Sequence, residues 1–123
     1  MLASSIGWIL IISGVATAGA GLAALLLPHT VLKLVFGADD ADALTMFLLR
    51  HWGALLFVVC ALTVYAAYYP DTRGPILTAA IVEKAIIFVL IFFGPAKRTA
   101  AMTAIATMDG TLAVLFAAYL AGL

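Results

Sequence analysis

The chain has 123 residues, of which 67% are hydrophobic and 10% are charged, with six Lys and Arg against six Asp and Glu. A soluble domain is about half apolar and about a quarter charged, so this chain has too few polar side chains to cover a water-facing surface. With no net charge there is no basic patch for phosphates. The composition therefore excludes a soluble enzyme, a disordered chain and a nucleic-acid-binding protein, and it predicts an integral membrane protein.

Four apolar stretches are long enough to cross a bilayer. About 20 helical residues, each rising about 1.5 Å, cross a hydrocarbon core of roughly 30 Å. The stretches that meet this length are residues 4–27, 42–69, 75–94 and 98–121. Each of the four prolines falls at a break between stretches, where a missing backbone N–H does not interrupt a helix. The sequence predicts one all-α domain, a transmembrane four-helix bundle.

The first stretch, residues 4–27, carries no charge and is rich in Gly and Ala. Its apolar run is too long for the hydrophobic region of a secretory signal, so we expect it to be a retained first span. Small residues recur along one side of it: Gly7, Gly14, Ala18 and Gly21. Because small side chains let helix backbones approach closely in lipid, this side packs either inside the bundle or against another protomer.

A short segment separates the first two spans. Residues 29–36 are mostly apolar with the single charge of Lys33, and they are too few to span. We expect a short helix lying in the membrane interface, followed by an acidic turn that contains Asp39 and Asp40. Asp42 is then placed to cap the second span, because a carboxylate is favourable at the positive end of a helix dipole.

The two ends of the bundle differ in aromatic and basic residues. Trp8 and the four tyrosines fall toward the end where the chain begins, as in an interfacial aromatic belt. Lys33, Lys97 and Arg98 fall at the other end, against Arg73 alone at the first. By the positive-inside rule the more basic end is cytoplasmic, which predicts both termini outside, with dual insertion as the alternative.

Five ionisable residues lie inside the predicted spans: Arg50, His51, Glu83, Lys84 and Asp109. A charged side chain at membrane depth costs a few kcal/mol, so such groups face the bundle interior and pair. Arg50 is roughly 12 Å from the end of its span, and Glu83 and Asp109 are roughly 16 Å from the ends of theirs. A long arginine side chain closes this gap, so we expect Arg50, Glu83 and Asp109 to meet near the midplane.

This predicted cluster has two interpretations. In one, Arg50 only neutralises the two carboxylates and fixes how the helices dock. In the other, the cluster binds a small lipophilic or protonatable molecule, because two carboxylates that share one cation leave one of them free to exchange a proton. Catalysis by Arg50, Glu83 and Asp109 would then be acid–base isomerisation of a hydrophobic substrate, since only general acids and bases are present.

Four further residues are predicted to support the ligand site. Lys84 points about 100° away from its neighbour Glu83, so it either joins the cluster as a second cation or meets another protomer. His51 is a ligand-binding candidate, with axial ligation of a b-type haem as the weaker alternative. Trp52 and Gly53 complete this run, and Gly53 leaves room for a ligand or for a close helix contact. We predict no metal and no resident cofactor, with haem or a quinone as the alternatives.

Several features recur in order along the chain. A Gly- and Ala-rich first span is followed by a proline and the apolar stretch 31–37, by Arg50 and Gly53 in the second span, and by the acid Asp109 late in the bundle. In this layout the chain resembles small bacterial four-helix proteins of the DoxX-like family. The resemblance implies a multi-pass protein of the bacterial inner, or cytoplasmic, membrane, often encoded beside redox or lipid metabolism. It transfers no catalytic residue.

Three functions stay open at this point. The first is a ligand-binding protein with acid–base chemistry at the midplane. The second is a non-catalytic accessory subunit of a larger redox or lipid-metabolism complex, which small size and Gly- and Ala-rich helices favour. The third is a proton-coupled exporter of lipophilic cations that works as a homo-oligomer, although the predicted cluster supplies no unpaired acid for it. No HExxH, GxSxG or P-loop motif supports hydrolysis or nucleotide chemistry.

Overall fold

The computed structural model describes residues 2–94 and 98–122, and within these ranges the chain is helical with no strand. Its elements are α1 (Leu2–Leu26), α2 (Pro28–Phe36), α3 (Ala43–Tyr68), the short 3-10 helix η1 (Pro70–Thr72), α4 (Arg73–Phe93) and α5 (Ala100–Leu120). Of these helices, α1, α3, α4 and α5 are long and apolar enough to cross a membrane. The predicted all-α, four-helix, multi-pass architecture is confirmed.

The predicted ends of the spans differ from the observed ends by only a few residues. The starts of α1, α4 and α5 each differ by two residues, and α4 begins at Arg73 rather than at Pro75. Pro75 fits inside the first turn because the backbone N–H groups of that turn have no partner within the helix. Pro28 likewise opens α2. The predicted tight loop 95–97 lies outside the described residues.

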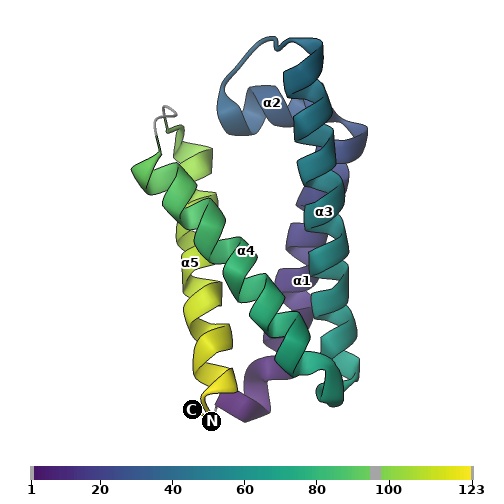
Figure 1. Ribbon diagram of the computed structural model, residues 1–123, viewed down its shortest axis with the longest axis vertical. Helices are drawn as coiled ribbons and strands as arrows, with labels where there is room; N and C mark the ends of the chain where they lie inside the picture. Colours follow the sequence, from purple (N-terminus) through teal and green to yellow (C-terminus); the bar gives the residue numbers. More distant parts are fainter. Residues whose placement is uncertain (1, 95–97, 123) are drawn as a thin grey trace.

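The four long helices form two pairs, α1 with α3 and α4 with α5 (Figure 1). α4 runs obliquely, from beside α5 at one end of the molecule to the start of α1 and the end of α3 at the other. The pairs therefore converge where α1 begins and α5 ends, which we call the terminus end. They separate toward the other end, which α2 crosses and which we call the α2 end.

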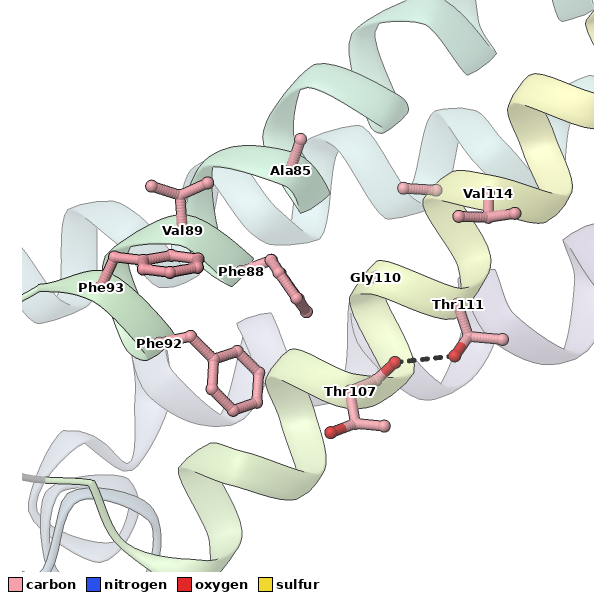
Figure 2. A pocket seen from close by; sticks show the side chains of 10 residues that line it. Ala85, Phe88, Val89, Phe92, Phe93, Thr107, Gly110, Thr111 and Val114 are labelled. Carbon is pink, nitrogen blue, oxygen red and sulfur yellow. Dashed lines mark hydrogen bonds between the residues drawn. The ribbon is translucent and has the colours of Figure 1, made fainter.

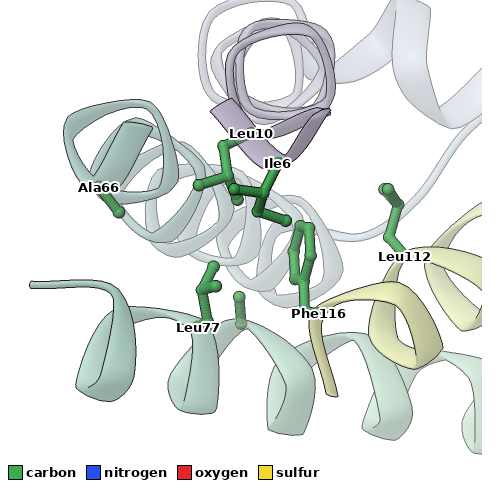
Figure 3. Close-up of a cluster of buried hydrophobic side chains, with 7 residues drawn as sticks. Ile6, Leu10, Ala66, Leu77, Leu112 and Phe116 are labelled. Carbon is green, nitrogen blue, oxygen red and sulfur yellow. The ribbon is translucent and has the colours of Figure 1, made fainter. Parts of the chain in front are cut away.

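The terminus end contains a closed apolar core to which all four long helices contribute (Figure 3). Phe116 of α5 is fully buried there and points toward α1. The other buried members are Ile6, Leu10, Ala66, Leu77, Ala80 and Leu112. Because lipid is as apolar as these side chains, their close packing, rather than escape from water, holds the helices together.

Arg73 links three helices at the same end. Its Nε donates a hydrogen bond to the carbonyl of Ala66 at 2.8 Å, and its Nη2 donates to the carbonyl of Ala67 at 2.9 Å. Its Nη1 donates to the Tyr119 hydroxyl at 3.1 Å. The last carbonyls of a helix lack partners within it, so Arg73 of α4 stabilises the end of α3 and joins it to α5.

At the opposite end, α2 is held between the two helix pairs. Gly37 ends α2 with a φ of 68°, a left-handed conformation that glycine adopts without strain. The hydroxyl of Thr99, the N-cap residue of α5, donates a hydrogen bond to the carbonyl of Val35. Leu32 is buried on one side of α2, whereas Lys33 and Leu34 are exposed. The short helix predicted between the first two spans is therefore present.

The small residues of α1 pack against α3 within the bundle. A Cβ atom added to Gly21 would lie 2.6 Å from the Phe57 nitrogen, and one added to Gly53 would lie 2.6 Å from the Gly21 carbonyl oxygen. Gly14 also faces α3, whereas nothing lies within 4 Å of such an atom on Gly7. Of the two interpretations of this side of α1, packing inside the bundle is confirmed at Gly14 and Gly21. Gly53 serves a close helix contact.

Candidate functional site

A buried ion pair joins the middle of α4 to the middle of α5. Lys84 Nζ lies 3.3 Å from Asp109 Oδ1, and the two residues are 3% and 5% exposed. Across residues 2–94 and 98–122 it is the only salt bridge shorter than 4.0 Å. Two charges at this depth each avoid a penalty of several kcal/mol only by pairing. Lys84 therefore joins the cluster as its cation.

The expectation that Arg50 neutralises the carboxylates is wrong. Arg50 is exposed on α3, and its Nε donates a hydrogen bond to the carbonyl of Leu25 at 3.1 Å. Leu25 belongs to the last turn of α1, whose carbonyls have no partners within the helix. α3 begins beyond the level at which α1 ends (Figure 1), so Arg50 lies near the end of α1 and not at the midplane.

Glu83 lies next to Lys84 in sequence but faces a different neighbour. It lines an open groove of about 760 Å³ between α3 and α4, which it shares with Trp52 of α3 and with apolar side chains of α4. Its Oε2 atom is buried and has no hydrogen-bond partner in the described part of the chain. Lys84 and Asp109 act on Glu83 only through their electrostatic fields. Glu83 therefore lines the groove, and one of its carboxyl oxygens is buried at membrane depth without a partner among the described residues.

Two buried polar residues extend this layer to the other helices. Cys60 of α3 is buried, and its thiol interacts with the Thr17 hydroxyl of α1 and electrostatically with the charges of α4 and α5. Thr17 also donates a hydrogen bond to the Ser13 carbonyl at 2.6 Å. Sequence reasoning missed this contribution because Cys60 lies in an apolar run. Its signal is its place in α3, about ten residues or roughly 15 Å beyond Arg50.

His51 and Trp52 lie in different environments. His51 is exposed, and its ring is parallel to that of Phe47, with centroids 6.3 Å apart and 1° between the ring planes. Trp52 is half-buried, meets Phe36 edge-on and lines the Glu83 groove. The other histidine, His29, is exposed on α2. Among the residues with described positions, no three His, Cys, Asp or Glu side chains gather closely enough to hold a metal ion.

A second groove of about 760 Å³ lies between α4 and α5 (Figure 2). The rings of Phe88 and Phe92 turn toward α5 beside Gly110. The polar groups that line it are already bonded, because the Thr111 hydroxyl donates to the Thr107 carbonyl at 2.8 Å and the Thr107 hydroxyl donates to its own preceding turn. Of the two grooves that α4 lines, only the Glu83 groove therefore offers a polar atom with no partner among the described residues.

The predicted site residues thus separate into three groups. Glu83, Lys84 and Asp109 lie in the central layer, with Trp52 at the edge of its groove. Arg50 and His51 line another groove at the α2 end. Gly53 belongs to the contact between α1 and α3.

Comparisons of the chain with models of protein families, with curated proteins and with solved structures find no match. The DoxX-like resemblance therefore stays a prediction.

Proposed function

We propose that the protein binds a small lipophilic molecule with a basic or cationic group in the groove between α3 and α4, and that Glu83 exchanges a proton for it. The observation that carries this proposal is the buried Glu83 Oε2 atom, which accepts no hydrogen bond from any described residue. An unpaired carboxyl group at membrane depth is costly, and such groups are retained at ligand and proton sites. A proton or a bound cation satisfies it.

The walls of the groove fit the rest of such a ligand. Apolar side chains of α4 line most of it, so a hydrophobic body is accommodated. Trp52 lies at its edge, and the face of an indole ring attracts a cation. A carboxyl group and an aromatic ring in an apolar groove together favour a lipophilic cation over a neutral lipid.

The Lys84–Asp109 pair leaves no free cation that could neutralise Glu83. Asp109 neutralises Lys84 at 3.3 Å, so Glu83 is left without a cation of its own. The pair also fixes the rotation of α4 against α5, which keeps Glu83 on the side that faces α3. In a catalytic version of this proposal, Glu83 would serve as the general acid or base.

Proton-coupled export of a lipophilic cation is the second candidate function. The sequence offered no unpaired acid for it, whereas Glu83 supplies one in an open groove. Exchange of one proton for one cation at a single carboxylate would couple the two movements. Uptake of a lipophilic cation into proteoliposomes under a proton gradient distinguishes this function from binding alone.

Binding is tested with Trp52 as the reporter. The chain has two tryptophans, so Trp8→Phe leaves Trp52 as the only one. In lipid nanodiscs, tetraphenylphosphonium should quench Trp52 fluorescence, and Glu83→Gln in the same background should weaken binding about tenfold, a loss of about 1.4 kcal/mol. Neutral triphenylphosphine oxide should not distinguish the two proteins. Thr107→Val, in the apolar second groove, is the matched control, and equal affinity in the Glu83→Gln protein would refute the proposal.

We also propose that the α2 end faces the cytoplasm of a bacterial inner membrane, with both termini outside. Lys33 and Arg98 lie at the α2 end, whereas Arg73 at the terminus end is occupied by the carbonyls of α3. Lys97 lies outside the described residues. With Cys60 replaced by Ala, a membrane-impermeant maleimide should label Asp71→Cys but not Asp39→Cys in intact cells, and the reverse pattern would invert the orientation. We further propose that the chain belongs to the DoxX-like family, and the short helix after the first span supports this.

A further inference from the structure

We propose a second binding site, at the α2 end of the α1–α3 pair, for the phosphate of an anionic lipid. The site is a groove of about 530 Å³ that Arg50 and His51 line together with Leu25, Met46 and Phe47. It shares no lining residue with the Glu83 groove. The two grooves differ in the sign of their charge, so they select different ligands.

Arg50 has hydrogen-bond donors that no described residue uses. Its Nε is occupied by the Leu25 carbonyl, and neither terminal nitrogen has a hydrogen-bond partner among residues 2–94 and 98–122. No carboxylate of these residues lies within 4.0 Å of it. A guanidinium group that keeps both terminal nitrogens can bind two oxygens of one phosphate. The hydrogen bond through Nε limits the rotation of the group, so less freedom is lost when a phosphate binds.

The acidic residues of the neighbouring turn do not neutralise this charge. The Asp42 carboxylate accepts a hydrogen bond from the Thr45 backbone nitrogen at 2.8 Å, which fixes it as the cap of α3. The Asp40 carboxylate accepts from the Ala41 nitrogen at 2.8 Å. Because both are held by local backbone groups, the positive charge of Arg50 stays available to an anion from outside the chain.

The depth of Arg50 suits a lipid headgroup. Leu25 is in the last turn of α1, and α2 begins only three residues later, at Pro28. A spanning helix ends where the hydrocarbon core gives way to the headgroups, which is the level of the lipid phosphates. Arg50 is therefore level with the phosphates of the leaflet at the α2 end.

The apolar walls favour a lipid over a free phosphate ion. Leu25, Met46 and Phe47 lie beside the charge, and His51 is stacked parallel to Phe47. A soluble ion would leave these side chains uncovered, whereas the glycerol and upper acyl chains of a lipid would pack against them. Two other described basic residues at this end line neither this groove nor the Glu83 groove: Lys33 is exposed on α2, and the Arg98 guanidinium lies over the Phe92 ring.

Native mass spectrometry of the full-length protein tests this site. The protein is released from detergent micelles that contain equal mole fractions of phosphatidylglycerol and phosphatidylcholine. We expect wild type to retain phosphatidylglycerol about fivefold over phosphatidylcholine, since one basic residue at a membrane surface contributes about 1 kcal/mol. Arg50→Gln should abolish this preference, whereas the matched controls Lys33→Gln and Arg98→Gln should keep it. No preference in wild type, an unchanged preference in Arg50→Gln or an equal loss in both controls would overturn the proposal.

Two further measurements separate the alternatives. Inorganic phosphate at millimolar concentration should not displace phosphatidylglycerol, and displacement would identify a free-anion site instead of a lipid site. If Arg50→Gln loses helix content by circular dichroism, the test moves to His51→Gln, which leaves the Arg50–Leu25 hydrogen bond in place. We expect that variant to lower the preference about twofold, and an unchanged preference there would then refute a site that includes His51.

Discussion

The terminus end and the α2 end of this bundle are built on different principles. At the terminus end all four long helices contribute to one apolar core, and the three donor nitrogens of Arg73 are all bonded. Toward the α2 end the helix pairs separate, and Glu83 and Arg50 have polar atoms with no partner among the described residues. The terminus end thus has its polar groups bonded around one closed core, whereas polar atoms without a protein partner are found toward the α2 end.

The difference indicates how a small chain can support a costly site. A protein of this size has few contacts with which to offset an unpaired charge, so its unsatisfied groups must be supported elsewhere in the fold. Here the closed core holds the four long helices together at the terminus end, and the Lys84–Asp109 pair forms the boundary between the two ends. We expect mutations in the closed core to alter stability, and substitutions of Glu83 and Arg50 to alter binding.

The largest loss of stability is expected at the boundary itself. Lys84→Met leaves Asp109 buried without its partner, and removing one member of a buried pair costs about 3–5 kcal/mol. Unfolding by sodium dodecyl sulfate in mixed micelles, followed by circular dichroism, measures this loss. The double variant Lys84→Met/Asp109→Leu has no charge left to bury, so it should regain most of the stability. A single variant as stable as wild type would show that the pair is not closed in the membrane.

A smaller loss is expected within the closed core. Phe116→Ala removes a fully buried ring and leaves a cavity of roughly 100 Å³, which costs about 2–3 kcal/mol of unfolding free energy. Phe93→Ala is the matched control, because Phe93 is 78% exposed to lipid and its loss opens no cavity. The same detergent titration compares the two variants. Equal losses would mean that the terminus end is no more tightly packed than the surface.

A third variant tests how closely α1 packs against α3 toward the α2 end. A Cβ atom on Gly53 would lie 2.6 Å from the Gly21 carbonyl oxygen, so Gly53→Ala must push α1 away from α3 at a cost of about 1–3 kcal/mol. Gly19→Ala is the control, because nothing lies within 4 Å of its added atom. That control should be neutral or slightly stabilising, since alanine is the better helix former. No difference between the two would place the whole α2 half among the loosely packed regions.

The fold was predictable because membrane thickness dictates helix length. Four long apolar runs, with a proline at each break, correspond to four spans to within a few residues. The short helix α2 was equally predictable, because its apolar run is too short to cross the membrane. What the pattern lacked was the pairing of the spans, since hydropathy says that a helix crosses and not which neighbour it packs against.

The site was predictable in its acids but not in its cation. Counting depth from the end of each span assumes that all spans end on one plane, whereas α3 extends beyond the end of α1, and this extension moves Arg50 away from Asp109. The choice between Glu83 and Lys84 depended on the rotation of α4. A usable signal was present, because Leu77, Lys84 and Ile91 recur every seven residues and all three are buried. That spacing puts Lys84 on the packed side and Glu83 beside it.

The smallest expected effect is a pH dependence at the α2 end. A hydrogen bond from the Thr45 hydroxyl, together with one from the Thr45 backbone N–H, lowers the pKa of Asp42 below its ordinary value. Because the folded pKa is depressed, Asp42 contributes stability that is fully present above its unfolded pKa of about 3.9 and is lost as the pH falls through the lower folded value.

Asp42→Asn keeps an N-cap acceptor but does not titrate, so its stability should vary less than that of wild type below about pH 4. Detergent unfolding of both proteins from about pH 3 to pH 6 makes the comparison. Parallel curves would mean that the cap of α3 does not form in the membrane-bound protein, and the α2 end would then be looser than the contacts of Asp42 indicate.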